Sequence, residues 1–307
     1  MTPVEYLVLY GLAFVVPLGV TLVTTPFAIA VAKRFGILDR PGERKVHLDA
    51  TPYLGGAAIA LGLIVAAVLT GSTARQAAVI GAGAVVVFVV GLLDDVRGLG
   101  PATRAGVEVL VGAGLWFGQI RAGLFGFAPL DLLLTIAWIV VVTNSVNLLD
   151  NMDGLASGVT AIAAIAYFVM AAAQENYFVA SMAIGLAGAS VGFLRHNFPP
   201  ARIFLGDAGS LLLGYLLAVT ALIVDLNVAN PVARAAVQAL ILGVPVFDTA
   251  FVVITRIRAG RPVLVGGTDH SSHHLARRGL SPRRVALVLY GGQAICSAAA
   301  VAIAIGR

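Results

Sequence analysis

Charged residues are scarce in this chain of 307 residues. They make up 11% of the sequence, whereas hydrophobic residues make up 59% and the mean hydropathy is +0.97. Soluble domains carry about 25% charged residues, so the scarcity of charge argues against an ordinary soluble protein. The composition indicates an integral membrane protein.

Cysteine is nearly absent as well. The single cysteine, Cys296, lies inside the last apolar run, so a disulfide framework is excluded and we interpret this residue as a buried thiol. We expect no cleavable signal peptide, because the first apolar run is too long and lacks a basic flank and a small-residue cleavage site. That run is predicted to be the first spanning helix. We find no low-complexity tract and no convincing internal repeat.

Long apolar runs, in contrast, recur along the whole sequence. A helix needs about 20 residues to cross the roughly 30 Å of hydrocarbon in a bilayer. Runs of about this length lie at approximately 5–32, 53–70, 77–93, 104–120, 129–147, 157–173, 177–194, 209–226, 232–256 and 285–304. This pattern predicts an all-α, polytopic membrane protein of about ten transmembrane helices, with residues 1–307 forming a single domain.

The basic residues are unevenly distributed. The net charge of +5 and the pI of about 9.7 would by themselves fit a protein that binds nucleic acid. If the N-terminus is outside, however, sixteen of the 20 lysines and arginines fall in the cytoplasmic connections, and only Arg75, Arg121, Arg234 and Arg307 do not. This positive-inside bias predicts that both termini are extracytoplasmic and argues against nucleic acid as a partner.

Five connections on the predicted cytoplasmic face carry most of the acidic residues and histidines. They span about 33–52, 94–104, 144–157, 195–208 and 257–284. A carboxylate at the edge of a bilayer loses hydration, which is costly unless a partner compensates for it. Because five such loops meet at one face, we predict that they form an active site.

The first two connections combine basic and acidic groups. Lys45 and His47 supply donors for phosphate, although a loop that is basic only because it is cytoplasmic would look the same. In "GLLDDVRGLG", Asp94 and Asp95 repel each other at the end of a helix, which calls for a cation unless the turn is simply solvated. Arg104 opens the next helix, where backbone amides also attract anions.

The third connection, "NSVNLLDNMDGL", offers oxygen ligands. Asn144 and Asn147 supply neutral oxygens, Asp150 and Asp153 supply charged ones, and Gly154 allows close backbone approach. Mg²⁺ takes oxygen ligands, usually one or two carboxylates together with water and substrate phosphates. The sequence therefore predicts a Mg²⁺ site here, with Mn²⁺ as the alternative ion.

The last two connections carry an aspartate at a helix start and a group of histidines. In "NFPPARIFLGDAGS", Asp207 lies among small residues, and Phe204 is a stacking surface or plain packing. His270, His273 and His274 could ligate zinc. Cysteine ligands are missing, however, and seven arginines surround the histidines, so donors to a polyanion fit better.

These groups together suit one kind of chemistry. Carboxylates and amides beside basic donors fit a Mg²⁺-bound diphosphate, and their position at the membrane surface indicates a lipid co-substrate. Transfer of a phospho-sugar to a lipid phosphate brings negative charges together, and two unit charges at 4 Å repel by about 4 kcal/mol at an effective dielectric of 20. Charge neutralisation is therefore the main task, and a metal is needed more than a general base.

Several motifs in order resemble a known family. "GLLDDVRGLG", "VVTNSVNLLDNMDGLASG", "NFPPARIFLGDAGS", "PVFDTAFVVITRIRAGRP" and the histidine-containing tail, from about residue 39 to 282, are similar to the polyprenyl-phosphate N-acetylhexosamine-1-phosphate transferases. That superfamily includes undecaprenyl-phosphate GlcNAc-1-phosphate transferases and the phospho-MurNAc-pentapeptide transferase. The resemblance implies Mg²⁺-dependent transfer from a UDP-N-acetylhexosamine to a polyprenyl phosphate in the plasma membrane, with a cytoplasmic active site, release of UMP and a place at the start of cell-envelope glycan synthesis. A homodimer is compatible with it.

The resemblance also implies roles for individual residues. Asp94 and Asp95 match the acidic pair needed for catalysis, with Asp150 and Asp153 in the second acidic motif. Asn147 and Asp207 match positions that coordinate Mg²⁺. The predicted substrate contacts are Asn197, Phe204, Asp153 and Lys45 for the nucleotide, with Phe204 stacked on uracil, and His47, Arg104, His270, His273 and His274 for phosphate and sugar.

This chain departs from the family pattern at two places. Asn151 stands where relatives often have glycine, and the tail reads His-x-x-His-His where many members have His-x-His-His. A longer histidine-rich run that selects the MurNAc-pentapeptide is missing, which favours UDP-GlcNAc. A secondary transporter would place its ionisable residues near the midplane and often in repeated halves. A CDP-alcohol phosphotransferase would need Asp-Gly-x-x-Ala-Arg, which "DGLASG" does not satisfy.

Overall fold

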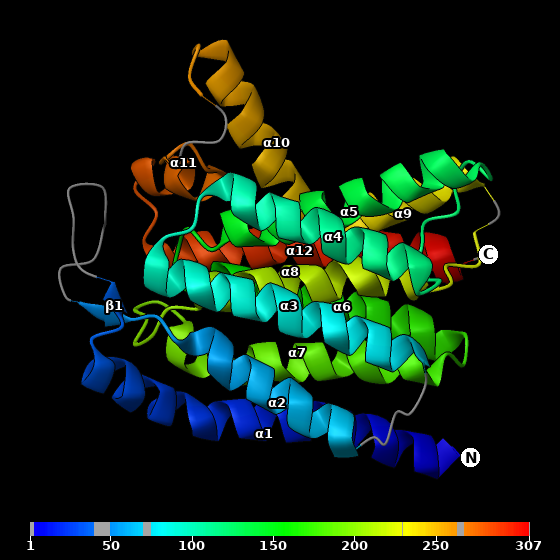
Figure 1. The fold of residues 1–307 in the computed structure, drawn as a ribbon, viewed down its shortest axis with the longest axis horizontal. Helices are drawn as coiled ribbons and strands as arrows, with labels where there is room; N and C mark the ends of the chain where they lie inside the picture. Colours follow the sequence, from blue (N-terminus) through cyan, green and yellow to red (C-terminus); the bar gives the residue numbers. More distant parts are fainter. Residues whose placement is uncertain (1–2, 40–49, 70–74, 229, 263–266, 307) are drawn as a thin grey trace.

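The computed structural model describes residues 3–39, 50–69, 75–228, 230–262 and 267–306 (Figure 1). Regular structure in these residues is almost entirely helical, which confirms the predicted all-α fold. The described strands are β1 (Leu38–Asp39) and β2 (Thr51–Pro52), which pair antiparallel with Leu38 opposite Pro52.

The helices follow one another with short connections. They are α1 (Pro3–Phe35), α2 (Gly55–Leu69), α3 (Arg75–Arg97), α4 (Pro101–Phe117), α5 (Ala128–Leu149), α6 (Leu155–Ala173), α7 (Tyr177–Asn197), α8 (Gly206–Ile223), α9 (Pro231–Ile241), α10 (Gly243–Arg258), α11 (Ser271–Arg277) and α12 (Pro282–Ile305). Each predicted apolar run overlaps with one of these helices or with a pair of them.

Fewer helices than expected are long enough to span a bilayer. Within the described residues, seven pass on length and apolar character: α1, α3, α5, α6, α7, α8 and α12. α2 has 15 residues and α4 has 17, close to the lower limit for a crossing. The count of ten spans and the placement of the termini relative to a membrane stay predictions.

The apolar run at 232–256, predicted as one transmembrane helix, is divided into two helices in the structure. α9 and α10 meet at a bend of 87°, so they form at most one broken span. Pro245 has no N–H to donate to the carbonyl of Ile241, four residues earlier, which interrupts the helix. Gln293 from α12 stabilises the break, because its Nε2 donates to Ile241 O at 2.6 Å and its Oε1 accepts from Val244 N at 3.1 Å.

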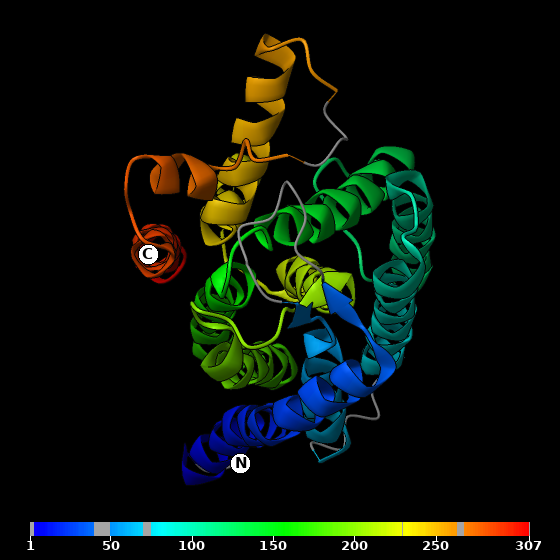
Figure 2. The same ribbon diagram turned by 90° about the vertical axis from the view of Figure 1, so that its left-hand side faces the viewer.

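α8 forms the core of the bundle. Every residue from Ala208 to Ala221 is buried, as expected of a helix that is apolar on all sides. α3, α5, α2, α6 and α7 pack around it. Figure 2 views the molecule from the end that carries β1 and α11, and both figures show α10 standing out from the bundle.

Two glycines let neighbouring helices approach the start of α8. A Cβ on Gly91 of α3 would lie 2.6 Å from Ala208 Cα, and one on Gly56 of α2 would lie 2.3 Å from Gly209 N. Both distances are too short for any side chain. The first turn of α8 is therefore held against α2 and α3, and this contact fixes where Asp207 lies.

Candidate active site

An arginine joins two of the predicted carboxylates at the start of α8. Arg104, in the first turn of α4, donates through Nη1 to Asp94 Oδ2 at 2.7 Å and to Asp207 Oδ2 at 2.9 Å. Asp94 is at the end of α3, so three helices contribute to this contact. Asp94 is almost buried, whereas about a third of the Asp207 side chain is exposed. The cationic partner predicted for the acidic pair is thus present in the protein itself.

Asp95 has a different environment from its neighbour Asp94. Its carboxylate accepts the backbone N–H groups of Asp207 at 2.7 Å and of Ala208 at 3.0 Å. Gly206 precedes them with φ +75°, and a Cβ there would lie 2.7 Å from Asp95 Oδ2. Asp95 therefore caps the N-terminus of α8 from outside the helix. In this structure it holds Asp207 in place, and direct catalysis by Asp95 stays a prediction.

Asn147 and Asp207 lie side by side, as two ligands of one cation should. Asn147, near the end of α5, donates from Nδ2 to Asp207 Oδ1 and to Ser210 Oγ at 2.9 Å. Among the described residues, no group of three or more Asp, Glu, His or Cys side chains is arranged to hold a metal. The donor set of one carboxylate and one amide nevertheless fits Mg²⁺, which binds few protein ligands and completes its shell with water and phosphate oxygens.

Asp150 follows α5 directly and lies within the field of other carboxylates. Burial first, and then the negative charges of Asp207, Asp95 and Asp153, raise the pKa of Asp150 well above its ordinary value. Like charges and desolvation both disfavour the ionised form. A divalent cation at Asn147 and Asp207 would offset this repulsion, so the charges around Asp150 are consistent with a metal site.

Asn197 is a buried brace between two loops. Its Oδ1 accepts from Gly154 N at 3.0 Å and from Ser157 Oγ at 3.2 Å, and its Nδ2 donates to Ile203 O at 3.0 Å. Only 2% of the residue is exposed. The side chain of Asn197 is thus occupied by protein partners, and its predicted contact with the nucleotide stays a prediction.

The same two loops are joined a second time by Asp153. Its Oδ2 accepts the backbone N–H of Ala201 at 2.9 Å. Phe204, farther along the loop, is half-buried, and its backbone pairs with the start of α2 and with β2 through Gly55 and Pro52. The structure thus brings Asp153 and Phe204 to one end of the bundle. Lys45 and His47 lie outside the described residues.

The histidine segment is oriented by an aspartate that received no role from the sequence. Asp248 of α10 is 1% exposed and accepts from His270 Nδ1 at 2.7 Å, Ser271 N at 2.7 Å and Ser271 Oγ at 2.6 Å. A carboxylate that holds one ring nitrogen fixes the ring and leaves the other nitrogen for a substrate. The signal that could have revealed this partner was that Asp248 is the one acidic residue of α10 and lies within its apolar first half.

The three histidines do not have equivalent positions. The rings of His270 and His273 lie 5.9 Å apart, whereas His274 packs edge-on against Phe251 of α10 at 5.1 Å. Burial, followed by the nearby His270 and Arg277, lowers the pKa of His273, which favours its neutral form. The contact of His274 with an aromatic ring separates it from the other two, and its predicted role in sugar binding is the least supported by the geometry.

An ion-pair cluster anchors the N-terminal side of α11. Asp269 accepts from Arg256 Nε at 3.1 Å and from Arg261 Nη2 at 2.9 Å. Burial alone would raise the pKa of Asp269, but the hydrogen bonds and charges of Arg256 and Arg261 outweigh it and lower the pKa. This aspartate stays ionised, so α11 is fixed to the end of α10.

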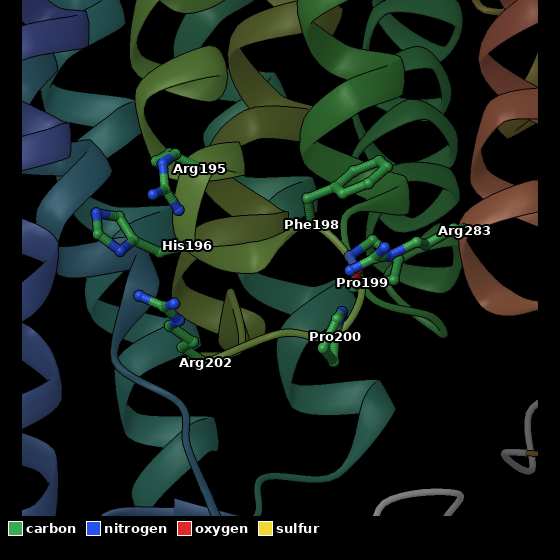
Figure 3. A pocket seen from close by; sticks show the side chains of 7 residues that line it. All are labelled: Arg195, His196, Phe198, Pro199, Pro200, Arg202 and Arg283. Carbon is green, nitrogen blue, oxygen red and sulfur yellow. The ribbon is translucent and has the colours of Figure 1, made fainter.

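A basic hollow lies at the end of α7. It has a volume of about 360 Å³ and is lined by Arg195, His196, Phe198, Pro199, Pro200, Arg202 and Arg283. Figure 3 shows Arg195, His196 and Arg202 at the left and Arg283 at the right, beside Pro199. Its lining contains none of the carboxylates described above. The segment that lines the hollow also carries Ala201, whose N–H donates to Asp153 of the predicted active site.

Comparisons with known proteins show to which family this chain belongs. A model of glycosyl transferase family 4 matches residues 77–225, which include Asp94, Arg104, Asn147 and Asp207. A Bacillus subtilis protein named "Probable undecaprenyl-phosphate N-acetylglucosaminyl 1-phosphate transferase" is 34% identical over 93% of this chain and 82% of its own length.

Two further relatives carry related names. Decaprenyl-phosphate N-acetylglucosaminephosphotransferase of Mycolicibacterium smegmatis is 32% identical over 94% of this chain and 80% of its own length. Phospho-N-acetylmuramoyl-pentapeptide-transferase of Moorella thermoacetica is 30% identical over 88% of this chain and 91% of its own length. The chain therefore belongs to the family of polyprenyl-phosphate N-acetylhexosamine-1-phosphate transferases, and it is a membrane-embedded transferase.

Proposed function

We propose that this enzyme transfers N-acetylhexosamine-1-phosphate, with GlcNAc-1-phosphate as the favoured group, from a UDP-sugar to a polyprenyl phosphate. The products are UMP and a polyprenyl-diphosphate-linked sugar, which starts a cell-envelope glycan on the cytoplasmic face of the plasma membrane. One observation carries the proposal: Arg104, Asp94, Asp207 and Asn147 form one connected group at the start of α8. The names of the relatives supply the acceptor and the sugar.

The reaction is a displacement at phosphorus. An oxygen of the lipid phosphate attacks the phosphorus atom that bears the sugar, and a new P–O bond forms. The bond from that phosphorus to the oxygen shared with UMP breaks, and its electron pair leaves with UMP. The lipid phosphate is largely dianionic at neutral pH, because its second pKa is about 6, so the attacking oxygen needs no base to remove a proton.

The residues of this chain position and neutralise the substrates. Asp207 and Asn147 would hold Mg²⁺, which when bound supplies positive charge to the diphosphate. Arg104, which pairs with Asp94 and Asp207 through Nη1, would add positive charge beside the diphosphate. His270 presents its second ring nitrogen, because Asp248 holds the first. Positioning and charge stabilisation of this kind are the main contributions a protein makes to phosphoryl transfer.

The proposal is tested by supplying purified protein with UDP-GlcNAc, polyprenyl phosphate and Mg²⁺. We expect UMP and a lipid product whose mass equals the acceptor plus one N-acetylhexosamine phosphate. Chelation of the metal should abolish both products, and a panel of other UDP-sugars should identify the preferred donor. If every UDP-N-acetylhexosamine is left intact while a known family member works in the same assay, the proposed function is wrong.

A further inference from the structure

Two departures of this chain from the family pattern are joined in the structure. Asn151, in the loop that follows α5, stands where relatives often have glycine. Ser272 is one of the two serines between His270 and His273. The hydroxyl of Ser272 donates to Asn151 Oδ1, across 121 residues of sequence. The two departures thus form one contact between the acidic loop (residues 150–154) and α11.

We propose that Asn151 and Ser272 are positioning residues that set the spacing between the metal-binding end of the site and its histidine end. This inference rests on the proposed function, because the diphosphate of the sugar nucleotide is the substrate group that would contact both ends. The pair is distinct from the residues predicted to contact substrate. The pair acts through the loop after α5 and through α11, the segments on or beside which those residues lie.

Asn151 is held at both ends of its amide. Its Nδ2 donates to Leu148 O at 2.7 Å, a carbonyl in the last turn of α5 that has no partner within the helix. This bond fixes the amide and directs Oδ1 toward α11. A glycine at position 151 could make neither contact, so the direction of the loop depends on the asparagine side chain.

Ser272 is fully buried, with an exposed fraction of 0%. Its neighbours in sequence have their own roles: Ser271 bonds to Asp248, and His273 lies against the ring of His270. Removing the hydroxyl would leave the half-buried Asn151 Oδ1 without that partner, which is more costly than losing a fully solvated hydrogen bond. The hydrogen bond therefore constrains both segments.

Other contacts between the acidic loop and α11 are apolar. Met152 and Leu275 both pack on a small core formed by Leu149, Leu155 and residues of α10 and α12. Within the described residues, the Asn151–Ser272 contact is the one side-chain hydrogen bond between residues 150–154 and α11. Apolar packing is non-directional, whereas a hydrogen bond has a preferred geometry. The polar pair thus fixes how the two segments are aligned.

This arrangement predicts that loss of the hydrogen bond lowers kcat/KM for the UDP-sugar donor and leaves the KM for the polyprenyl phosphate acceptor unchanged. Asn147, in the last turn of α5, and Asp150 precede Asn151. His270, directly before α11, and His273 of α11 lie on either side of Ser272. A sugar nucleotide that contacts both segments loses pre-organised partners when the hydrogen bond is removed. A lipid phosphate that enters beside Asp94 and Arg104 does not depend on α11.

The experiment compares Ser272→Ala, Asn151→Gly and the double variant with wild-type enzyme. We expect each single variant to lose about fivefold in kcat/KM for the UDP-sugar, the value of one neutral hydrogen bond, with an unchanged KM for polyprenyl phosphate. The kcat/KM of the double variant should be no lower than that of the less active single variant, because both changes remove the same contact. Ser190→Ala is the matched control: Ser190 is equally buried, and its hydroxyl bonds only to Leu186 O of its own helix.

Thermal unfolding of each variant in detergent separates positioning from misfolding, since Ser272→Ala and Ser190→Ala should melt at similar temperatures. Three results would overturn the inference while leaving the proposed function intact. They are losses that multiply in the double variant, equal effects on the kinetics of donor and acceptor, and full activity of both single variants. A wild-type enzyme that transfers no sugar phosphate would overturn the proposed function, and this inference with it.

Discussion

Arg104 reduces the repulsion between carboxylates at the start of α8 but does not remove it. Its single positive charge is shared by Asp94 and Asp207, while Asp95 and Asp150 lie close by. Like charges at about 4 Å repel by roughly 4 kcal/mol at an effective dielectric of 20. A divalent cation would offset the repulsion among the carboxylates that stay ionised before the anionic substrates enter.

Asp207 is the residue on which the proposed metal site depends most directly. Replacing it by asparagine keeps its size but removes the charge, so we expect the rate of UMP release to fall by about 10²-fold or more. A higher concentration of Mg²⁺ should recover part of that loss, because the remaining ligands bind the ion more weakly. Initial rates across a Mg²⁺ titration measure both effects.

The matched control for this change is Asp225→Asn. Asp225 is an exposed carboxylate beyond the other end of α8, where it accepts the N–H of Asn227. Its replacement should leave the rate and the Mg²⁺ dependence unchanged. Full activity of Asp207→Asn at ordinary Mg²⁺ would remove Asp207 from the metal site.

Short motifs predicted much of the site at the level of single residues. Asp94, Arg104, Asn147 and Asp207 were each singled out by a charge or amide at the edge of an apolar run, and the structure brings all four together. The environment of Asp95 was not predictable in the same way. Its partners are the backbone N–H groups of α8, more than a hundred residues away, and backbone donors leave no mark in a sequence.

The contact between α1 and α7 shows how elements are fixed by small residues. A Cβ on Gly188 would lie 2.2 Å from Phe14 O, and one on Gly192 would lie 2.4 Å from Leu18 O. The backbones of the two helices therefore touch, as small residues allow in membrane proteins. Pro26 of α1 adds a polar contact, because it leaves the carbonyl of Leu22 without a helical donor and His196 Nε2 lies 3.1 Å from that oxygen.

We expect Gly188→Ala to destabilise the protein by about 1–3 kcal/mol, the range for overpacking of a tight interior. The added methyl group would push α7 away from α1, and α7 ends at Asn197. Thermal unfolding in detergent measures the loss. Gly114→Ala is the control, since a Cβ at Gly114 in α4 meets nothing within 4 Å, and its melting temperature should not fall. Equal behaviour of the two variants would contradict the close contact.

Hydrophobic periods and helix breakers predicted most helices but not their bends. The apolar run at 232–256 contains Gly243 and Pro245, yet α1 holds Pro17 and Pro26 and continues as one helix from Pro3 to Phe35. α9 and α10 differ from α1 in having Gln293 of α12 beside the break. Its side chain bonds to Val244 N and to Ile241 O, the latter 52 residues away in sequence. A proline indicates where a helix can bend, and the tertiary partner decides whether it does.

At the scale of the whole molecule, the polar chemistry is confined to one end. In Figure 1, β1 and α11 lie at one end of the bundle and both termini at the opposite end. The end of α3, the start of α4, the end of α5 and the start of α8 meet at the end with α11 through the contacts of Arg104, Asn147, Asn151 and Ser272. A membrane around the bundle would therefore place the active site and the termini on opposite sides.

The excess of arginine and lysine in the connections at the active-site end predicts that this end is cytoplasmic. The prediction can be tested with single cysteines in a Cys296→Ala background, which removes the only native thiol. Ser281→Cys lies at an exposed position between α11 and α12, and Gly123→Cys lies at an exposed position between α4 and α5, at the other end. Neither substitution touches the proposed site.

A membrane-impermeant maleimide should label Gly123→Cys in intact spheroplasts and Ser281→Cys only after the membrane is permeabilised. The two positions serve as controls for each other, because both are exposed and both should react in permeabilised cells. The reverse pattern would place the site outside the cell. A cytoplasmic UDP-sugar could not reach it there, so that result would contradict both the topology and the proposed donor.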